Sequence, residues 1–388
     1  MGKRNKVGLI FSYNENWIGG SYYILNLIES LKLLDDNLMP SLVVFSSSND
    51  DFDRVKQLDY PYIEFFLLEK DKISISFPFF FKVINKLFKI MAYKKLLYKK
   101  PSFNINDLGL DVLFPAVDDY FFKPVKNKVF WIPDFQEHFL PQFFKKSEVE
   151  HRKSQQNKLI ENNRHVVFSS YTAQQHFFEI YPEATNKTSV LQFAVTHPNY
   201  QLKNSESVLK KYNINNPYFF CSNQFWAHKN HKVIFDALIK IKSQGEKIQV
   251  VFSGKETDYR NPNFIEEIKM FVKVNNLEEF VKFLGFIDRA DQLLLMKKAI
   301  AVIQPSLFEG WSTVVEDVKA MSQYLILSSI DVHKEQVSEN VLFFNPNKPT
   351  ELANILLEIN KTNPIKTQIL YDSKRFGFAN NFINVINS

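Results

Sequence analysis

The stretch PSLFEGWSTVVEDVKAM, residues 305 to 321, joins a polar loop to a predicted helix. Apolar residues at helical spacing form the expected buried face of that helix: Val314, Val315, Val318 and Met321. The helix is predicted to begin near Ser312 or Thr313, and either side chain is enough to cap it. The carboxylate of Glu309 and the adjacent Gly310 are not needed for a cap. They therefore indicate a ligand-binding loop.

Short apolar runs alternate with amphipathic stretches on both sides of this segment. The pattern begins with KVGLIFSY at residues 6–13 and restarts with PYFFCSN at residues 217–223. Strands that alternate with helices predict parallel sheets with crossover helices, here in two doubly wound α/β domains. In such sheets ligands bind beyond the carboxyl ends of the strands. The loops that follow predicted strands are therefore the places to look for a site.

The polar segment AVTHPNYQLKNSES, residues 194–207, is the expected domain boundary. We predict a first domain over residues 1–198, a second over residues 199–370 and a terminal segment over residues 371–388.

Composition limits the class of protein. The chain has 388 residues, of which 45% are hydrophobic, and carries a net charge of +6 with one cysteine, Cys221. A single cysteine excludes an intramolecular disulfide framework and a multi-cysteine metal site, which favours a reducing, cytoplasmic location. The first apolar run is too short for a signal peptide, and no run has the length of a membrane span. The mild positive charge suits an anionic ligand or membrane surface, and we expect no nucleic acid partner.

The first candidate loop is NENWIGGSYYILNL, residues 14–27. Gly19 and Gly20 follow the first predicted strand and precede a helix. Backbone amides at such a turn, together with the helix dipole, suit a phosphate group. The loop lacks the GxGxxG pattern of dinucleotide sites, and a plain strand-to-helix turn is the alternative.

The second candidate loop is SNQFWAHKNHKVIFDAL, residues 222–238. Lys229 lies between a predicted strand and a helix, where an ammonium group could neutralise a diphosphate. The alternative is a solvated basic loop. His228 and His231 flank Asn230, but no Cys, Asp or Glu lies nearby in the sequence to complete a ligand set, so we expect no metal.

Two carboxylates complete the candidate set. Glu309 lies at a strand end, where its two oxygens could accept two sugar hydroxyls. The alternative for Glu309 is an interaction with the helix start alone, and Glu316 and Asp317 by themselves are typical of a solvated helix face. Asp134 and His138 in WIPDFQEHFLPQFF, residues 131–144, could reach a substrate, or Asp134 could only cap a turn.

Each of the four tryptophans lies in or beside one of these loops: Trp17, Trp131, Trp226 and Trp311. Aromatic rings of this kind can stack against sugar rings and bases, although tryptophan also packs in ordinary cores.

The chain resembles the family 4 retaining glycosyltransferases over most of its length, and most strongly in its second half. GKETDYRN (254–261), VKFLGFIDRADQLLLMKKA (281–299) and residues 301–337 follow that family in order and spacing. Glu309 and Asp317 match its E-x7-E signature, with Asp in place of the second Glu. WIPDFQEHFLPQFF and NQFWAHKNH are similar to a subgroup found in bacterial polysaccharide gene clusters. The resemblance implies the GT-B fold: two Rossmann-like domains facing a cleft, with a C-terminal helix that returns to the first domain.

The resemblance also implies roles for individual residues. Catalytic roles fall on Glu309, Lys229 and Asp134. Acceptor-side roles fall on Trp131, Asp134 and His138. The implied donor-binding residues are Gly19, Gly20, Asn223, Gln224, Lys229, Gly254, Gly285, Phe286, Ile287, Glu309, Gly310, Trp311, Ser312, Thr313 and Asp317. Three positions depart from the family pattern: Asp317 is shorter than Glu, Gln224 replaces an Arg, and Pro133 replaces a His.

The expected reaction follows from this resemblance. It is the transfer of a hexose or deoxyhexose, with retention, from a UDP-, GDP- or dTDP-linked donor. The acceptor would be a glycan or a polyprenyl-linked glycan in surface polysaccharide synthesis, and no metal or other cofactor is expected. The three departures keep two alternatives open, a non-catalytic sugar-nucleotide-binding partner of another transferase and a GT-B sugar-nucleotide epimerase.

Residues 79–97 predict an amphipathic helix on the first domain. Its polar face carries Lys82, Lys86 and Lys89, opposite a Phe- and Leu-rich face. This pattern is typical of a helix that lies on an anionic membrane, here the inner face of the cytoplasmic membrane. The alternative is that the apolar face packs onto the first sheet.

Overall fold

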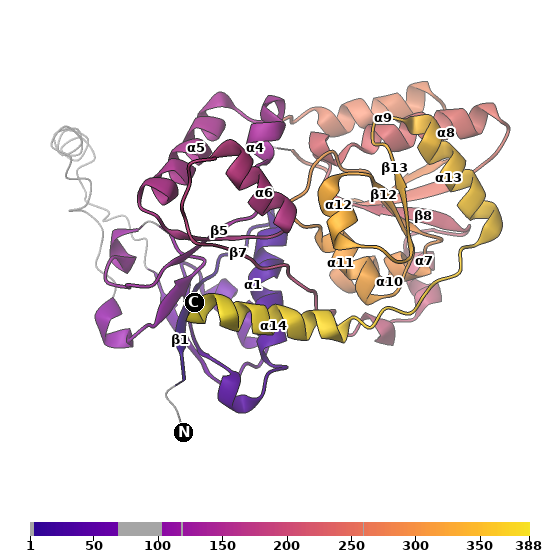
Figure 1. Ribbon diagram of the computed structural model, residues 1–388. Helices are drawn as coiled ribbons and strands as arrows, with labels where there is room; N and C mark the ends of the chain where they lie inside the picture. Colours follow the sequence, from indigo (N-terminus) through magenta and orange to yellow (C-terminus); the bar gives the residue numbers. More distant parts are fainter. Residues whose placement is uncertain (1–3, 69–102, 118, 259) are drawn as a thin grey trace, which may run out of the picture. The chain divides into compact units, whose positions relative to one another are not determined.

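The computed structural model describes residues 4–68, 103–117, 119–258 and 260–388 (Figure 1). Their contacts form two compact units, Met1–Trp131 and Ile132–Ser388. The predicted boundary after residue 198 lies inside the second unit, so the three-part division stays a prediction. The amphipathic helix predicted at residues 79–97 lies outside the described residues. Among the helices that are described, none has the length and apolarity needed to cross a bilayer.

The first unit is built on a parallel sheet with the order β3-β2-β1-β4. Its strands are β1 (Lys6–Ile10), β2 (Ser41–Ser46), β3 (Ile63–Leu67) and β4 (Val112–Phe114), and β5 (Val129–Ile132) begins beside β4 through a bridge between Leu113 and Lys128. The α-helices among its described residues are α1 (Ile18–Leu31) and α2 (Asn49–Lys56). Val7, Gly8 and Leu9 of the central strand β1 are all buried, as expected of a strand covered on both faces.

One prediction about this unit is wrong. The glycine pair does not precede the first helix, because Gly19 and Gly20 lie within the first turn of α1. A Cβ on Gly20 would lie 2.6 Å from the ring of Trp17. Close packing under that ring is therefore a sufficient reason for glycine at this position.

The second unit begins with α4 (Gln136–Phe139), α5 (Lys146–Glu161), β6 (His165–Phe168), α6 (Tyr171–Ile180) and β7 (Thr188–Val190). Strands β6 and β7 pair in parallel. Phe168 of β6 packs with Phe135 and with Phe177 of α6 in a small aromatic core.

A six-stranded parallel sheet follows, in the order β10-β9-β8-β11-β12-β13. Its strands are β8 (Tyr218–Ser222), β9 (Gln249–Ser253), β10 (Val281–Phe283), β11 (Val302–Gln304), β12 (Leu325–Ser328) and β13 (Val341–Phe344). The helices are α7 (Ser205–Lys211), α8 (His231–Ser243), α9 (Phe264–Val274), α10 (Arg289–Lys298), α11 (Thr313–Ala320), α12 (Asp331–Gln336), α13 (Pro349–Thr362) and α14 (Asp372–Asn387). In chain order the strands run 3-2-1-4-5-6, the arrangement of a Rossmann sheet.

Alternate residues of the central strand point to opposite faces of this sheet, as the pleat requires. Phe219 and Cys221 of β8 join a core with α8, α9 and α13. Tyr218 and Phe220 join a second core with α7, α10 and α11. The sheet is therefore covered on both faces (Figure 1), which explains why its strands read as continuous apolar runs.

The carboxylate of Glu335 on α12 connects this sheet domain to α6. It accepts hydrogen bonds from the Tyr171 amide (2.8 Å), the Thr172 amide (2.8 Å) and the Thr172 hydroxyl (2.6 Å). The side chain of Gln192 donates a further hydrogen bond of 2.7 Å. The first helical amides of α6, which have no partner within their own helix, thus meet a negative charge.

We predict that Glu335→Ala lowers the free energy of unfolding by about 3 kcal/mol, because hydrogen bonds to a charged group are lost and the helix amides lose their partner. Urea denaturation monitored by circular dichroism measures the change. Glu339→Ala is the matched control, since Glu339 is exposed and lies on the same segment. Equal stability of the two variants would contradict this role for Glu335.

The terminal helix α14 ends beside the β6–β7 region. The carbonyl of Ser388 accepts a hydrogen bond from the side chain of Lys187, which directly precedes the first residue of β7. At its other end, the Tyr371 hydroxyl accepts a hydrogen bond of 2.9 Å from the Val195 amide. Both contacts tie the last residues of the chain to residues 187–195.

Candidate functional site

The strand order reverses between β8 and β11, which are adjacent in the sheet. In open α/β sheets such a switch point is where ligands bind. The loop after β8 carries Lys229, and the loop after β11 carries Glu309. A backbone hydrogen bond of 2.8 Å from Leu307 to His228 joins the two loops.

Lys229 and Glu309 form an ion pair at this switch point. The ammonium nitrogen of Lys229 lies 2.6 Å from Oε1 of Glu309, and their side chains are only 16% and 10% exposed. Oε1 also accepts hydrogen bonds from Gln304 (2.9 Å) and Ser306 (2.6 Å). Burial alone would raise the pKa of the Glu309 carboxyl, but the charge of Lys229 and the hydrogen bonds from Lys229 and Ser306 hold that pKa below its usual value.

The predicted position of Lys229 is confirmed. It ends a short 3₁₀ turn, Ala227–Lys229, and Asn230 then adopts a left-handed conformation (φ 53°) before α8 begins. The Asn230 side chain donates to the carbonyls of Pro305 (3.2 Å) and Pro346 (3.0 Å). The turn that presents Lys229 is therefore fixed to the loop that presents Glu309.

Gly310 brings the loop after β11 against the segment after β5. A Cβ on Gly310 would lie 2.4 Å from the carbonyl oxygen of Pro133 and 2.9 Å from Cβ of Asp134. Asp134 accepts a hydrogen bond of 3.0 Å from the Gln136 amide, which is the turn-capping role considered for it. Burial raises the pKa of the Asp134 carboxyl, and the nearby charges of Glu137 and Glu309 add to this. Asp134 is thus a neighbour of the ion pair.

Three partly buried rings lie beside these residues. Phe139 and His176 are 4.2 Å apart between ring centroids, and each stacks or tilts against Phe308, at 5.7 Å and 5.8 Å. His138 is exposed and contacts the edge of Phe139.

The helix start predicted at Ser312 or Thr313 is confirmed. Ser312 is the N-cap of α11, and its hydroxyl accepts from the Val315 amide at 3.4 Å. The Ser312 amide donates to Gln336 at 3.1 Å, so one of the four amides expected beside the donor already has a protein partner. The indole nitrogen of Trp311 donates to the Phe193 carbonyl at 3.1 Å.

The two acids of α11 do not form a solvated face, so that alternative is wrong. Asp317 has no exposed surface, and its Oδ1 lies 2.5 Å from Arg289 and 3.1 Å from His197. Burial would raise the pKa of the Asp317 carboxyl, but the Arg289 and His197 side chains lower it. The role of Asp317 toward a donor ribose stays a prediction.

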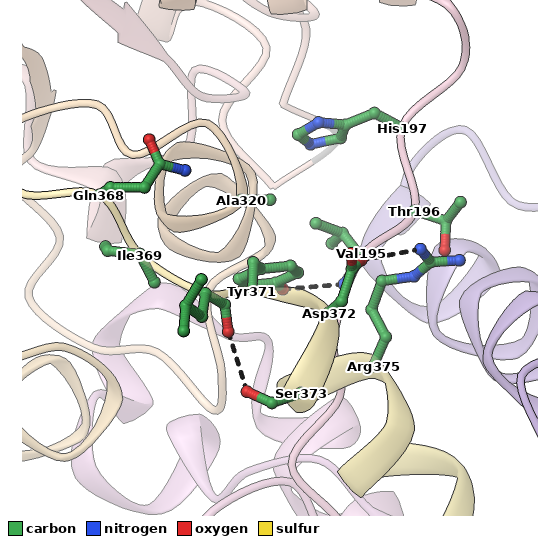
Figure 2. Close-up of a pocket in the computed structure, with 11 residues that line it drawn as sticks. Val195, Thr196, His197, Ala320, Gln368, Ile369, Tyr371, Asp372, Ser373 and Arg375 are labelled. Atoms are coloured by element: carbon green, nitrogen blue, oxygen red, sulfur yellow. Dashed lines mark hydrogen bonds and ion pairs between the residues drawn. The ribbon is translucent and has the colours of Figure 1, made fainter.

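Glu316 points into a second buried network. Its carboxylate pairs with Lys319 (2.6 Å) and accepts hydrogen bonds from Gln336 (2.9 Å) and the Tyr371 hydroxyl (2.5 Å). Figure 2 shows Tyr371 between Val195 and the start of α14, at the wall of a pocket of about 360 Å³. His197 lines the same pocket, so the pocket adjoins the partner of Asp317. Glu316 thus ties α11 to Tyr371, which precedes α14, while Asp317 pairs with Arg289 of α10.

The loops after β9 and β10 lie beside the same strand ends. Gly254 (φ 151°) is packed so closely that a Cβ would lie 1.9 Å from the Asn223 carbonyl oxygen, and its amide donates to Gly285 at 2.9 Å. The Asn223 side chain donates to Gln304 at 2.7 Å. Phe286 is 64% exposed, whereas Ile287 packs against the core formed with α10. Gln224 lies directly after Asn223.

Trp17 and Trp131 belong to the first unit, where they stack on each other with centroids 5.4 Å apart. Trp131 also stacks on Tyr23 at 4.1 Å. Whether these rings, Gly19 and Gly20 contact a ligand stays a prediction.

Within the described part of the chain, no group of three His, Cys, Asp or Glu side chains could hold a metal ion. His228 and His231 are buried, and burial, with the charge of Lys229, lowers the pKa of both imidazoles, that of His231 to about 3. His231 stacks on Phe225 at 4.4 Å.

The site also includes described residues to which the sequence analysis gave no role. They are Gln304, Ser306, Arg289, His197, His333 and Gln336. Most of them reach it from elements distant in the sequence.

The parallel α/β sheets of this chain, with the charged pair at the switch point of the six-stranded one, define the class as a GT-B fold. Solved structures share this fold. A glycosyltransferase from Rickettsia africae ESF-5 superposes with a TM-score of 0.63 at 16% identity, covering 99% of this chain and 96% of its own. HepE from Anabaena, solved in complex with UDP and glucose, gives a TM-score of 0.61 at 16% identity, covering 99% and 97%.

Residues 204–374 match the family model for glycosyl transferases group 1. A curated relative is the O-antigen chain mannosyltransferase RfbU of Salmonella typhimurium, 26% identical over 183 residues. The match spans 47% of this chain and 47% of RfbU, about half of each protein.

Proposed function

We propose that this protein is a glycosyltransferase of bacterial surface polysaccharide synthesis. It transfers a hexose or deoxyhexose, with retention, from a nucleotide-sugar donor to a glycan or lipid-linked acceptor. The observation that carries the proposal is the Lys229–Glu309 ion pair of 2.6 Å at the switch point between β8 and β11. The mannosyltransferase named above and the UDP complex of HepE support a sugar-nucleotide donor.

The paired groups have complementary tasks toward such a donor. When a donor binds, the Lys229 ammonium group can exchange its ion pair with Glu309 for one with the diphosphate. There it stabilises the negative charge that develops as the sugar leaves. Glu309 is then able to accept hydroxyls of the sugar, held in place by Gln304 and Ser306. No metal ion is needed for these steps. The acceptor hydroxyl attacks on the face that the diphosphate leaves, and its proton passes to the departing diphosphate.

The test uses purified protein with UDP-, GDP- and dTDP-hexoses, with and without a lipid-linked acceptor fraction, and with anomeric configuration read by NMR. We predict that Glu309→Gln lowers kcat/KM by about 100- to 1,000-fold, since a group that stabilises the transition state is lost. Glu339→Gln is the exposed control.

The outcomes separate the parts of the proposal. Unchanged turnover in Glu309→Gln would contradict the assigned site. A product of inverted configuration would contradict retention, and loss of activity in EDTA that Mn²⁺ restores would contradict metal independence. Release of an epimerised sugar nucleotide without acceptor would favour an epimerase, and binding of donor without any turnover would favour a non-catalytic partner.

A further inference from the structure

We propose that His333 is a positioning residue for Glu309, acting through Ser328 and Ser306. This inference rests on the proposed function in one respect, namely that Glu309 contacts the transferred sugar. His333 lies on α12, has no exposed surface and was assigned no role from the sequence.

The hydrogen bonds around His333 fix which nitrogen carries the proton. Nδ1 lies 2.9 Å from the carbonyl oxygen of Ser328, which can only accept, so Nδ1 is the donor. Nδ1 is also 3.1 Å from the Ser328 hydroxyl oxygen. That hydroxyl donates its own hydrogen to the Ser306 carbonyl at 2.6 Å. The Ser328 hydroxyl therefore accepts a hydrogen bond from Nδ1 of His333 and donates one to the Ser306 carbonyl.

The chain of hydrogen bonds then reaches the carboxylate. The Ser306 hydroxyl donates to Oε1 of Glu309 at 2.6 Å. Ser306, Ser328 and His333 are all fully buried, so water does not compete for these bonds. Ser328 ends β12 and Ser306 follows β11, its neighbour in the sheet. His333 thus joins two adjacent strand ends and fixes the serine that orients Glu309.

The charge state of the imidazole agrees with this role. Burial lowers the pKa of His333 to about 4, and the Lys229 charge adds to this effect, while the Glu309 charge opposes it. At neutral pH the ring is therefore neutral, with its hydrogen on Nδ1. No described residue hydrogen-bonds to Nε2. A substitution that preserves an N–H at the position of Nδ1 and one that preserves it only at Nε2 are therefore expected to have opposite effects.

His333→Asn and His333→Gln are the test pair. An asparagine amide places an N–H close to the position of Nδ1, whereas a glutamine amide places it close to Nε2. His333→Asn should retain the bond to Ser328, while His333→Gln and Ser306→Ala should lose the orientation of Glu309. We expect kcat/KM for the donor to fall by up to about 100-fold in the latter two and to stay near wild type in His333→Asn.

Binding measurements separate positioning from general damage. Glu309 is assigned to the sugar, so His333→Gln should weaken binding of the sugar nucleotide but not of UDP or GDP alone. Loss of UDP or GDP binding as well would assign His333 a merely structural role and overturn the proposal. An active His333→Gln with an inactive His333→Asn would move the function to Nε2 and also overturn it.

A second readout does not depend on turnover. Carbon-13 NMR of labelled glutamate carboxyls, with the Glu309 signal identified by its loss in Glu309→Gln, reports the pKa of Glu309 without substrate. That pKa should rise in His333→Gln and Ser306→Ala, because a hydrogen bond to the charged form is lost, and stay unchanged in His333→Asn. An unchanged pKa in all three variants would contradict the relay. Absence of turnover in the wild type would instead contradict the proposed function and leave this measurement decisive.

Discussion

Replacing Gly310 by alanine is expected to inactivate the protein and to lower its free energy of unfolding by about 3 kcal/mol. The new Cβ would lie 2.4 Å from the carbonyl oxygen and 3.0 Å from the carbonyl carbon of Pro133. Both are backbone atoms, so no side-chain rotation relieves the overlap and one of the two loops must move. Glu309 is the adjacent residue, and a shift of about 1 Å at a reacting group can cost about 100-fold in rate.

Gly377 provides the matched control for this substitution. It lies within α14, and a Cβ there would meet no atom within 4 Å. Gly377→Ala should therefore raise the free energy of unfolding by up to about 1 kcal/mol through helix propensity, with no effect on activity. Urea denaturation and donor kcat/KM measure both variants. If Gly310→Ala behaved like Gly377→Ala, the close approach to Pro133 would not constrain the site.

The sequence predicts which loops carry the site but not how they meet. Lys229 and Glu309 are each recognisable because a charged residue follows an apolar run and precedes a helix. Their ion pair joins residues 80 positions apart, and it depends on β8 and β11 being neighbours. That neighbour relation comes from the strand order, which alternation of strands and helices alone does not specify.

The buried acids show a second limit. Glu316 and Asp317 are adjacent on a helix, and local pattern favours solvent exposure for such a pair. Their partners come from elsewhere in the chain: Arg289 on α10, His197 before α7 and Tyr371 before α14. Burial of a carboxylate requires such partners, and the sequence gives no sign of which distant residues will supply them.

Two short strands illustrate a third limit. The runs LILS and VLFF of β12 and β13 are short and continuously apolar, so their periodicity does not distinguish a buried strand from part of a helix. The position of the glycine pair shows the opposite error. Gly19 and Gly20 indicate a turn by composition, but Trp17 covers Gly20 and the helix already includes both.

Acidification from pH 7.5 to pH 5 is expected to lower the free energy of unfolding, and two buried imidazoles contribute about 4 kcal/mol of that loss. His231 and His333 have no exposed surface, and burial lowers their pKa values to about 3 and about 4, from an ordinary value of 6.5. Between those values and 6.5 the unfolded chain binds protons that the folded chain does not. Stability is therefore greatest above pH 6.5 and falls as the pH drops, by about 2 kcal/mol for each imidazole at pH 5.

Urea denaturation at pH 7.5, 6 and 5 measures this loss, and two variants assign it. His231 stacks on Phe225, and neither of its nitrogens has a hydrogen-bond partner among the described residues. His231→Phe should therefore keep the packing and reduce the loss by about 2 kcal/mol, whereas His151→Gln, at an exposed position, should leave it unchanged. The same loss in His231→Phe as in the wild type would mean that His231 is not the group whose protonation destabilises the fold. Because both imidazoles lie near Lys229, their protonation would add positive charge beside an ammonium that has one carboxylate partner, Glu309, and acid should weaken the site before the whole fold is lost.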